Sequence, residues 1–478
     1  MTGFLPRMLP RIAFAGWETL LMRLGFAWLL WERFPTLAQL PPAEAPLRFP
    51  NGFARWIDFT WALQPEIFGV LSVVVTAALA LYVTGFAFPL ASTLLFLGYL
   101  VTGTLINSNG SISHYYQLMT LVLGFQALAA WLWASRHSPR AVWVRSPGDL
   151  HSFVTRATLQ VLAANYVLCG LTKLINSKGA WIANTLNMPV QFTKIEANKF
   201  YNTLEVPDMG IGGALNDLCI EHPWLCLVVY TPGLLLELFA FLLLFGRAWS
   251  LGIGLAVVAM HVIIKATMGL NFEQHQWIFL IFAVNAPYWL SRLTSWNPGK
   301  PAAEALPRIA FRGWRPAELA PWAGEWLRRG WRSAAFFWVS VLLGLIFKEN
   351  FPVSNWPMYG NITPHTGYAY LVDAADRPIP VNLFRESSSR LDKQFNREKS
   401  AAAQRARAAG QPENPETVDR PAGVHLLERL AGRLTAEQRA QFGQLGLVEV
   451  DLTLDRNRRV QKEERPIAKV PLEMTKSE

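Results

Sequence analysis

Nine separate stretches of about 20 mostly apolar residues run along the chain, and they limit its fold more than any other feature. A helix needs about 20 apolar residues to cross roughly 30 Å of hydrocarbon, so each stretch is a candidate membrane span. Charged residues make up 16% of the 478 residues, against about 25% in soluble domains. We expect an all-α integral membrane protein with about nine transmembrane helices, at 14–34, 66–84, 87–106, 114–134, 153–175, 224–246, 248–270, 273–291 and 332–347.

The net charge of +10 belongs mainly to this apolar part, where residues 1–347 hold 24 Lys and Arg against 16 Asp and Glu. The basic residues lie in the gaps between apolar stretches, which is typical of cytoplasmic loops. A basic face on a soluble module is absent from the pattern, so no nucleic-acid partner is expected. The bias predicts a cytoplasmic N-terminus and an exoplasmic C-terminus. The setting is then a lipid membrane, the inner membrane if the host is bacterial.

The chain is expected to divide at residue 348. Residues 1–348 form the membrane domain, with a cytoplasmic loop at 292–331, and residues 349–478 form a small exoplasmic α+β region. Alternating apolar residues and turn formers predict the elements of that region. In chain order they are turns with short strands at 351–373, an Arg/Ala-rich linker or exposed helix within 386–420, an amphipathic helix near 422–442, a strand at 447–454 and a frayed, charged end.

Several ionisable side chains fall within or at the ends of the expected spans, where they are costly and therefore candidate site residues. Lys173 ends the fifth span, His114 begins the fourth, His261 lies in the seventh with Lys265 one turn later, and Glu237 lies in the sixth. All but Glu237 fall in the exoplasmic half of the membrane. Each also has a plainer explanation, because a terminal lysine can extend to the headgroups and a membrane histidine can be an interhelical hydrogen-bonding group.

Other polar residues are less informative. Glu273 and His275 begin the eighth span so near the interface that solvation explains them. No local spacing of His114, His261 and Glu237 predicts a metal site. Cys219 and Cys226 lie on or near the outer side, and the sequence allows either a disulfide between them or two free thiols. The long outer segment 176–223 is expected to form short helices.

Three motifs resemble those of the vitamin K-dependent gamma-carboxylase superfamily, which includes the bacterial horizontally transferred transmembrane (HTTM) domain proteins. The first motif is similar to the family's segment around a Lys-Leu pair; here it reads YVLCGLTKL at 166–174 and is followed by Trp181. NSNGSISHYYQL at 107–118 resembles its Asn/Ser-His entrance to a helix. The stretch from Glu237 through Arg247 to His261 resembles its acid, arginine and histidine helix pair. The resemblance covers roughly residues 14–293.

The resemblance implies a reaction. In the carboxylase, the lysine deprotonates reduced vitamin K, and oxygen converts the quinol into a strongly basic alkoxide. The alkoxide removes a proton from a glutamate gamma carbon, carbon dioxide adds there, and vitamin K epoxide remains. By resemblance Lys173 is the base, and His114 and His261 hold the quinol oxygens. The expected quinone pocket is lined by Trp181, Glu237, Asn109, Tyr115 and Lys265.

Two functions therefore remain open. One is a membrane enzyme that couples oxidation of a menaquinol-type hydroquinone, with O2 and CO2 as co-substrates, to carboxylation of a secreted peptide. The other is a non-catalytic lipid- or quinone-binding protein or accessory subunit. Two departures bear on the choice, because Thr172 stands where animal carboxylases have a second lysine, and their lumenal domain is larger than residues 349–478.

Overall fold

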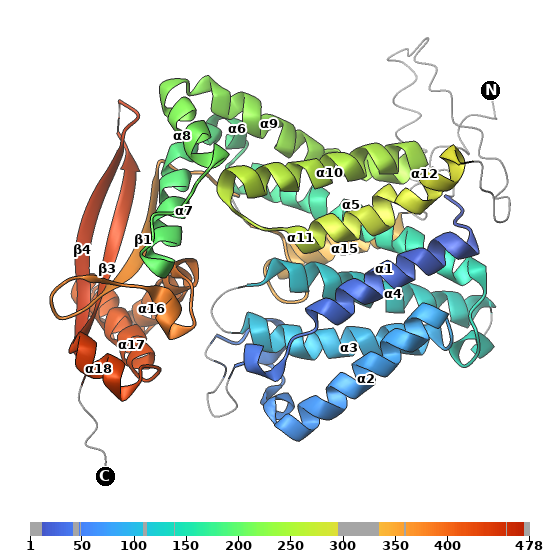
Figure 1. The fold of residues 1–478 in the computed structure, drawn as a ribbon, viewed down its shortest axis with the longest axis horizontal. Helices are drawn as coiled ribbons and strands as arrows, with labels where there is room; N and C mark the ends of the chain where they lie inside the picture. The colour runs from blue at the N-terminus through green and yellow to red at the C-terminus, as the bar shows by residue number, and fades with distance from the viewer. Residues whose placement is uncertain are drawn as a thin grey trace. The chain divides into compact units, whose positions relative to one another are not determined.

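The computed structural model describes residues 12–41, 47, 49–108, 112–137, 139–294, 334–357, 360–455 and 457–472 (Figure 1). Candidate residue Asn109 and most of the expected loop 292–331 lie outside this range. The chain divides into two compact units. The first takes in residues 1–176, 232–263 and 271–360, and the second takes in residues 177–231, 264–270 and 361–478. The single boundary expected at residue 348 is thus replaced by an interleaved division.

The first unit is helical. Its long helices follow the apolar stretches, since such stretches can satisfy every backbone hydrogen bond within one segment. They are α1 (Gly16–Arg33), α2 (Pro65–Thr84), α3 (Phe88–Asn107), α4 (His114–His137), α5 (Gly148–Asn176), the first part of α10 (Arg247–Met268), and α15 (Ala335–Phe347). Helix α9 (Trp224–Leu238) begins in the second unit and ends in the first. Helix α3 packs between α2 and α4, and α5 packs against α4 and α15.

Among the residues that the structure describes, five helices are long and apolar enough to cross a membrane, which is consistent with an integral membrane protein. They are α2, α3, α4, α5 and α10. Their surfaces differ, because 28% of the apolar window of α2 is buried against 67% of that of α4. Val70 and Val73 on α2 are 65% and 70% exposed, and lipid is the solvent in which such a surface is stable. The orientation of the termini stays a prediction.

The other four expected spans are not confirmed as single crossings. Helix α1 carries Glu18, Arg23, Glu32 and Arg33 within its 18 residues. In the sixth stretch, α9 ends at Leu238, and a 3-10 helix follows at Ala240–Phe245. The eighth is divided into α11 (Glu273–Phe279), a π-helical turn at Leu280–Val284 and α12 (Ala286–Leu293), with Asn285 left-handed between them. Helix α15 has 13 residues, or about 20 Å.

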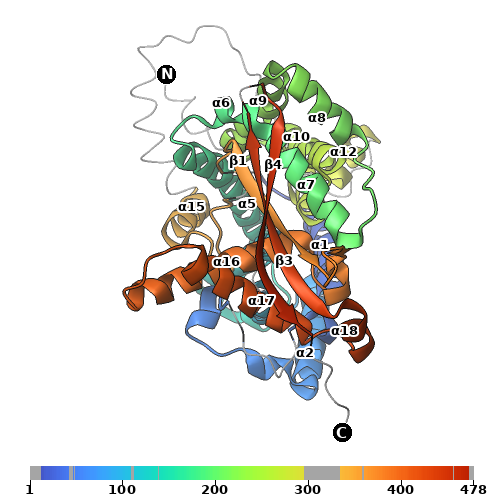
Figure 2. The ribbon, with the colours of Figure 1, turned by 90° about the vertical axis from the view of Figure 1, so that its left-hand side faces the viewer.

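The second unit contains one antiparallel sheet in the order β2-β1-β3-β4. Its strands are β1 (His365–Val372), β2 (Pro378–Ile379), β3 (Gln444–Leu454) and β4 (Val460–Pro471). The long, twisted β3–β4 hairpin is the most extended feature of this unit (Figure 2). Its helices are α6 (Trp181–Asn184), α7 (Met188–Thr203), α8 (Ile211–Glu221), α16 (Ser388–Ala408), α17 (Arg420–Ala431) and α18 (Ala436–Phe442).

Alternation along β1 explains how the helices cover both faces of the sheet. Tyr368 and Tyr370 lie in one apolar cluster with Val190 of α7. Ala369 and Leu371 point to the opposite face, which α16 and α17 cover. Because successive side chains of a strand point to opposite faces, one short strand serves two cores. Residues 177–231 therefore belong with the tail in the second unit, since α7 buries its apolar side on this sheet.

One expectation for the tail is confirmed in part and another is wrong. Of the linker and the exposed helix expected for the Arg/Ala-rich segment, the structure has a helix, α16, and one face of it, with Leu391, Phe395 and Ala402, is buried. The expected frayed end forms β4, which pairs with β3 from Val460 to Pro471. The expected helix near 422–442 is two helices, α17 and α18. The strand at 447–454 is confirmed as part of β3.

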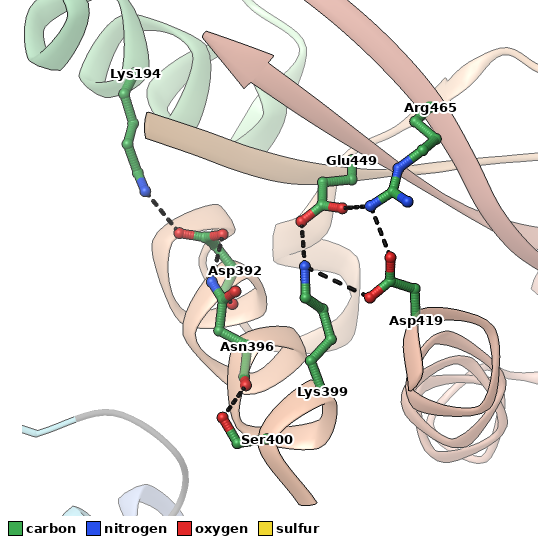
Figure 3. A network of polar contacts seen from close by, with 8 residues as sticks. All are labelled: Lys194, Asp392, Asn396, Lys399, Ser400, Asp419, Glu449 and Arg465. Atoms are coloured by element: carbon green, nitrogen blue, oxygen red, sulfur yellow. Dashed lines mark hydrogen bonds and ion pairs between the residues drawn. The ribbon is translucent and has the colours of Figure 1, made fainter. Parts of the chain in front are cut away.

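A network of charges attaches the helices to the sheet and explains why so polar a segment packs (Figure 3). Lys399 Nζ of α16 lies 2.8 Å from Glu449 Oε1 of β3 and 3.8 Å from Asp419 Oδ1. Arg465 Nη2 of β4 lies 2.6 Å from Glu449 Oε2 and 2.8 Å from Asp419 Oδ2. Opposite charges thus alternate around one ring, an arrangement that stabilises more than isolated surface pairs do.

Candidate functional site

Helix α5 presents three polar side chains at helical spacing toward one place in the first unit. Tyr166, Cys169 and Lys173 are three and four residues apart, so they share a face. Lys173 Nζ lies 2.5 Å from Glu237 Oε1 near the end of α9, and Cys169 Sγ donates to the same oxygen at 3.3 Å. The side chains of Lys173 and Glu237 are 11% and 6% exposed. Two groups that both occur in the resemblance therefore form a buried ion pair.

Tyr166 connects this pair to α10. Its hydroxyl lies 2.5 Å from His261 Nε2, and its ring packs edge-on against Phe279 at 4.8 Å between centroids. The predicted base and one predicted histidine thus belong to one site, with Tyr166 between their helices.

A row of aromatic rings extends from His261. The centroid of His275 lies 5.7 Å from that of His261 and 5.6 Å from that of Trp356. The Trp356 centroid is in turn 5.3 Å from that of His114. These four rings come from α10, α11, α4 and the segment after α15, so they gather only in the folded unit.

Trp356 is held firmly in this row. Its indole Nε1 donates to Asn165 Oδ1 at 2.8 Å, and its backbone N–H donates to Ser354 Oγ at 2.9 Å. Its side chain is buried, and its φ of 52° is in the left-handed region. A bulky residue adopts that region only where its surroundings determine it. The indole ring is therefore a built part of the site.

The chain before Trp356 is fixed from a distant loop. Asn51 Oδ1 accepts the Phe351 N–H at 2.8 Å, and Asn51 Nδ2 donates to the Glu349 carbonyl at 3.4 Å. The Glu349 carboxylate lies 3.8 Å from His114 Nε2, and His114 Nδ1 is 2.7 Å from Gln117 Oε1. The segment 349–356, which we call the Trp356 strap, thus brings a carboxylate and an indole to His114.

Three of the buried polar atoms at this site lie near His261 or Lys173 and have no hydrogen-bond partner within the described residues. They are Glu237 Oε2, His261 Nδ1 and His275 Nδ1. Buried polar atoms in folded proteins almost always have partners. A carboxylate oxygen and two imidazole nitrogens are suited to contact the hydroxyl or carbonyl groups of a bound molecule.

The predicted residues are brought together in part. Lys173, Glu237, His261 and His114 all lie in this site. Tyr115 is half-buried on α4 with its ring against Tyr116, at 4.5 Å between centroids. Trp181 and Lys265 belong to the second unit, where Trp181 is buried and Lys265 is exposed. Their place beside Lys173 stays a prediction, and Asn109 lies outside the described residues.

One expectation is corrected, and one residue of the resemblance lies elsewhere. Arg247 begins α10 about 21 Å along the helix from His261, and it pairs with Glu18 at 2.9 Å. His275 is 5% exposed instead of solvated, since it faces inward from α11. Its neighbour Glu273 is half-buried and pairs with Arg33 at 3.2 Å. Trp356 was missed altogether, although the Pro- and aromatic-rich sequence around it is unusual.

Comparison of the chain with protein-family models, curated proteins and solved structures finds no match. Function must therefore be argued from the chemistry of the site and from the short motifs. The site combines a buried amine and carboxylate, a tyrosine, three histidines and an indole, all among apolar helices. Such a set can exchange protons and can pack an aromatic ring.

Proposed function

We propose that this protein is a membrane enzyme of the vitamin K-dependent gamma-carboxylase type, which couples oxidation of a quinol to carboxylation of a glutamate-type acceptor. The proposal rests on the motif resemblance. The observation that carries it is the contact between Lys173 and Glu237 beside the Tyr166–His261 pair. A buried acid partner stabilises the ammonium that forms when an amine in a membrane accepts a proton.

Loss of a proton from the ion pair leaves a neutral Lys173 amine beside an unpaired Glu237 carboxylate. A hydroxyl within reach of Nζ can then return a proton to Lys173, which restores the ammonium–carboxylate pair at 2.5 Å. A buried charge is stable only with a partner, so Glu237 favours the protonated product. General-base catalysis by a positioned group typically contributes 10²–10⁴-fold.

The residues present fit a reduced naphthoquinone. When bound, a quinol supplies the reducing equivalents and, with oxygen, the base strength that removal of a carbon-bound proton needs. His261 Nδ1, His275 Nδ1 and Glu237 Oε2 are the buried atoms able to contact its ring oxygens. The imidazole and indole row can pack against its flat ring. Tyr166 holds the ring of His261 in position through Nε2.

The acceptor would be a carboxylate-bearing peptide on the exoplasmic side, as the predicted orientation requires. The alternative is a protein that binds a quinone or lipid in the same site without turnover. The enzyme and the non-catalytic binding protein would use the same residues to bind the quinone ring, so a binding measurement alone does not distinguish the two functions.

The test is turnover by the purified full-length protein in nanodiscs, given vitamin K hydroquinone, oxygen, labelled bicarbonate and a glutamate peptide. The proposal expects vitamin K epoxide and label in the peptide. Quinone binding without either product, in protein shown to be folded, would support the non-catalytic alternative. Absence of both binding and products would overturn the assignment.

A further inference from the structure

The first unit buries an arginine side chain that has no acidic partner. Arg23 of α1 is 9% exposed. Its Nε donates to the Thr19 carbonyl at 3.2 Å, and its Nη1 donates to the Tyr82 carbonyl at 3.3 Å. The buried acid of the same helix, Glu18, is paired with Arg247 instead. Among the described residues no carboxylate pairs with Arg23, so a buried guanidinium, which is costly without a partner, lacks a negative countercharge.

A histidine lies beside this guanidinium. A Cβ at Gly85 would be 2.4 Å from Arg23 Nη1 and 2.8 Å from His151 Nε2, so both nitrogens face the same point. His151 is 6% exposed, and its Nδ1 has no hydrogen-bond partner within the described residues. Its ring packs edge-on against Phe88, at 4.9 Å between centroids. Two groups that can donate hydrogen bonds therefore converge where Gly85 has no side chain.

The helix ends at this place do not neutralise the arginine. Arg23 donates to a carbonyl in the last turn of α2, where the helix dipole contributes about half a negative charge. His151 is in the first turn of α5, where the helix dipole contributes about half a positive charge. These two contributions roughly cancel, and Asp149, the acid of that turn of α5, is exposed. The buried place around Arg23 and His151 is therefore positively charged.

The surface beside this place is suited to a lipid. The backbone of Arg145 pairs with that of Phe86, the residue after Gly85. Arg145 is exposed, and Trp143, Val144 and Phe86 are 68%, 48% and 47% exposed. Exposed indole and basic groups together are typical of the level of lipid headgroups. Basic pockets between membrane helices bind phosphate-bearing headgroups.

We propose that Arg23 and His151 bind the phosphate group of a membrane lipid, whose glycerol and acyl chains contact Phe86, Trp143 and Val144. The inference does not depend on the proposed function. A guanidinium has five N–H donors, and the two backbone carbonyls accept from two of its nitrogens. A phosphate accepts hydrogen bonds from the remaining donors and supplies the negative charge that the buried arginine lacks. Because free phosphate has the same chemistry, the experiment compares it with the lipid.

The experiment measures thermal unfolding of the full-length protein in detergent, without addition and with phosphatidylglycerol, a galactosyl diacylglycerol that lacks phosphate, or inorganic phosphate. The proposal expects phosphatidylglycerol to raise the melting temperature and the galactolipid to leave it unchanged. Inorganic phosphate should act only at a higher concentration than phosphatidylglycerol. Stabilisation by inorganic phosphate and not by phosphatidylglycerol would overturn the lipid assignment in favour of a free anion. Equal stabilisation by both lipids, or none by either phosphate source, would overturn the proposal.

Two variants locate the effect. Arg23→Gln removes the guanidinium and should need at least about tenfold more phosphatidylglycerol for the same stabilisation, because hydrogen bonds to charged groups contribute that much to binding. His151→Phe keeps a ring against Phe88 but removes both ring nitrogens, and it should also weaken the response. Arg140→Gln, at an exposed position between α4 and α5, is the matched control and should respond as the parent protein does.

An unchanged response to phosphatidylglycerol in folded Arg23→Gln or folded His151→Phe would overturn the assignment of the site to these residues. If neither variant folds, the response of the parent protein to the two lipids and to inorganic phosphate still decides the proposal.

Discussion

Lys173 Nζ lies 2.5 Å from Glu237 Oε1, and this contact joins α5 to α9 inside the helical unit. The two residues are 64 positions apart in the chain. Each is costly in an apolar environment by itself, and together they are neutral. The contact therefore stabilises the unit, and in the proposed function it also takes part in proton transfer; the two roles can be separated by experiment.

The first prediction concerns stability. Glu237→Leu or Lys173→Met alone should cost about 3–5 kcal/mol, because each leaves one buried charge without its partner. The double variant Lys173→Met with Glu237→Leu should cost less than either single variant. Denaturant unfolding of the protein in detergent measures all three. Lys178→Met, at an exposed position, is the control, and strictly additive single and double effects would contradict the pairing.

The second prediction concerns Trp356. Trp356→Phe keeps a ring but loses the hydrogen bond to Asn165, so it should cost about 1 kcal/mol of folding free energy. Trp356→Ala should cost about 3–5 kcal/mol. Both should weaken binding of a naphthoquinone analogue, measured by calorimetry in nanodiscs. Trp56→Phe is the matched control because Trp56 is 72% exposed. Unchanged affinity in Trp356→Phe would limit the indole to a structural role.

The third prediction tests the strap itself. A Cβ at Gly52 would lie 1.9 Å from the Phe351 carbonyl oxygen, and Gly52 has a φ of +58°. Gly52→Ala should therefore displace the strap and cost more than about 1 kcal/mol. Gly16→Ala is the control, because a Cβ there meets nothing within 4 Å. Thermal unfolding distinguishes the two, and equal melting temperatures would show that the strap is not held at Gly52.

Elements of the fold could be predicted where their own residues carry a clear apolar pattern with recognisable ends. The second span was expected at 66–84 and α2 is Pro65–Thr84, because a proline begins the apolar run and Gly85 ends it in the left-handed region. Strand β4 was missed, since five of its twelve residues are charged and seven are exposed. Its formation depends on pairing with β3, which sequence patterning does not register.

The site was predictable residue by residue but not as an arrangement. Unusual polar groups in apolar helices identified Lys173, Glu237, His114 and His261. Which of them meet depends on the rotation of α9 and α10, and this is set by tertiary packing. The position of Trp356 depends on an irregular segment. The path of that segment is determined by contacts with residues about 300 positions earlier in the chain, as the hydrogen bond between Asn51 and Phe351 shows.

The fourth prediction concerns acid. Burial raises the pKa of Asp373, but hydrogen bonds from the Arg377 backbone and guanidinium and from the Ala375 N–H outweigh it, so the net pKa lies below the usual value. A lowered carboxyl pKa contributes stability above the unfolded value of about 3.9, and this contribution is lost as pH falls through the folded value.

Asp373→Asn should therefore destabilise the second unit at pH 7, and its difference from the parent protein should shrink as pH falls below about 4. Denaturant midpoints at pH 7, 5 and 3 measure this. Asp376→Asn, with a side chain 68% exposed, is the control for a neighbouring surface charge. A difference that stays constant with pH would contradict the role of the Asp373 carboxylate.

The most direct test of the central claim is formation of vitamin K epoxide by Lys173→Ala, compared with the parent protein and with Lys178→Ala, at equal amounts of folded protein and bound quinone. The account predicts epoxide from the parent protein and from Lys178→Ala, and a loss of at least 10²-fold in Lys173→Ala. Equal epoxide formation by Lys173→Ala would contradict the role of Lys173 as the base.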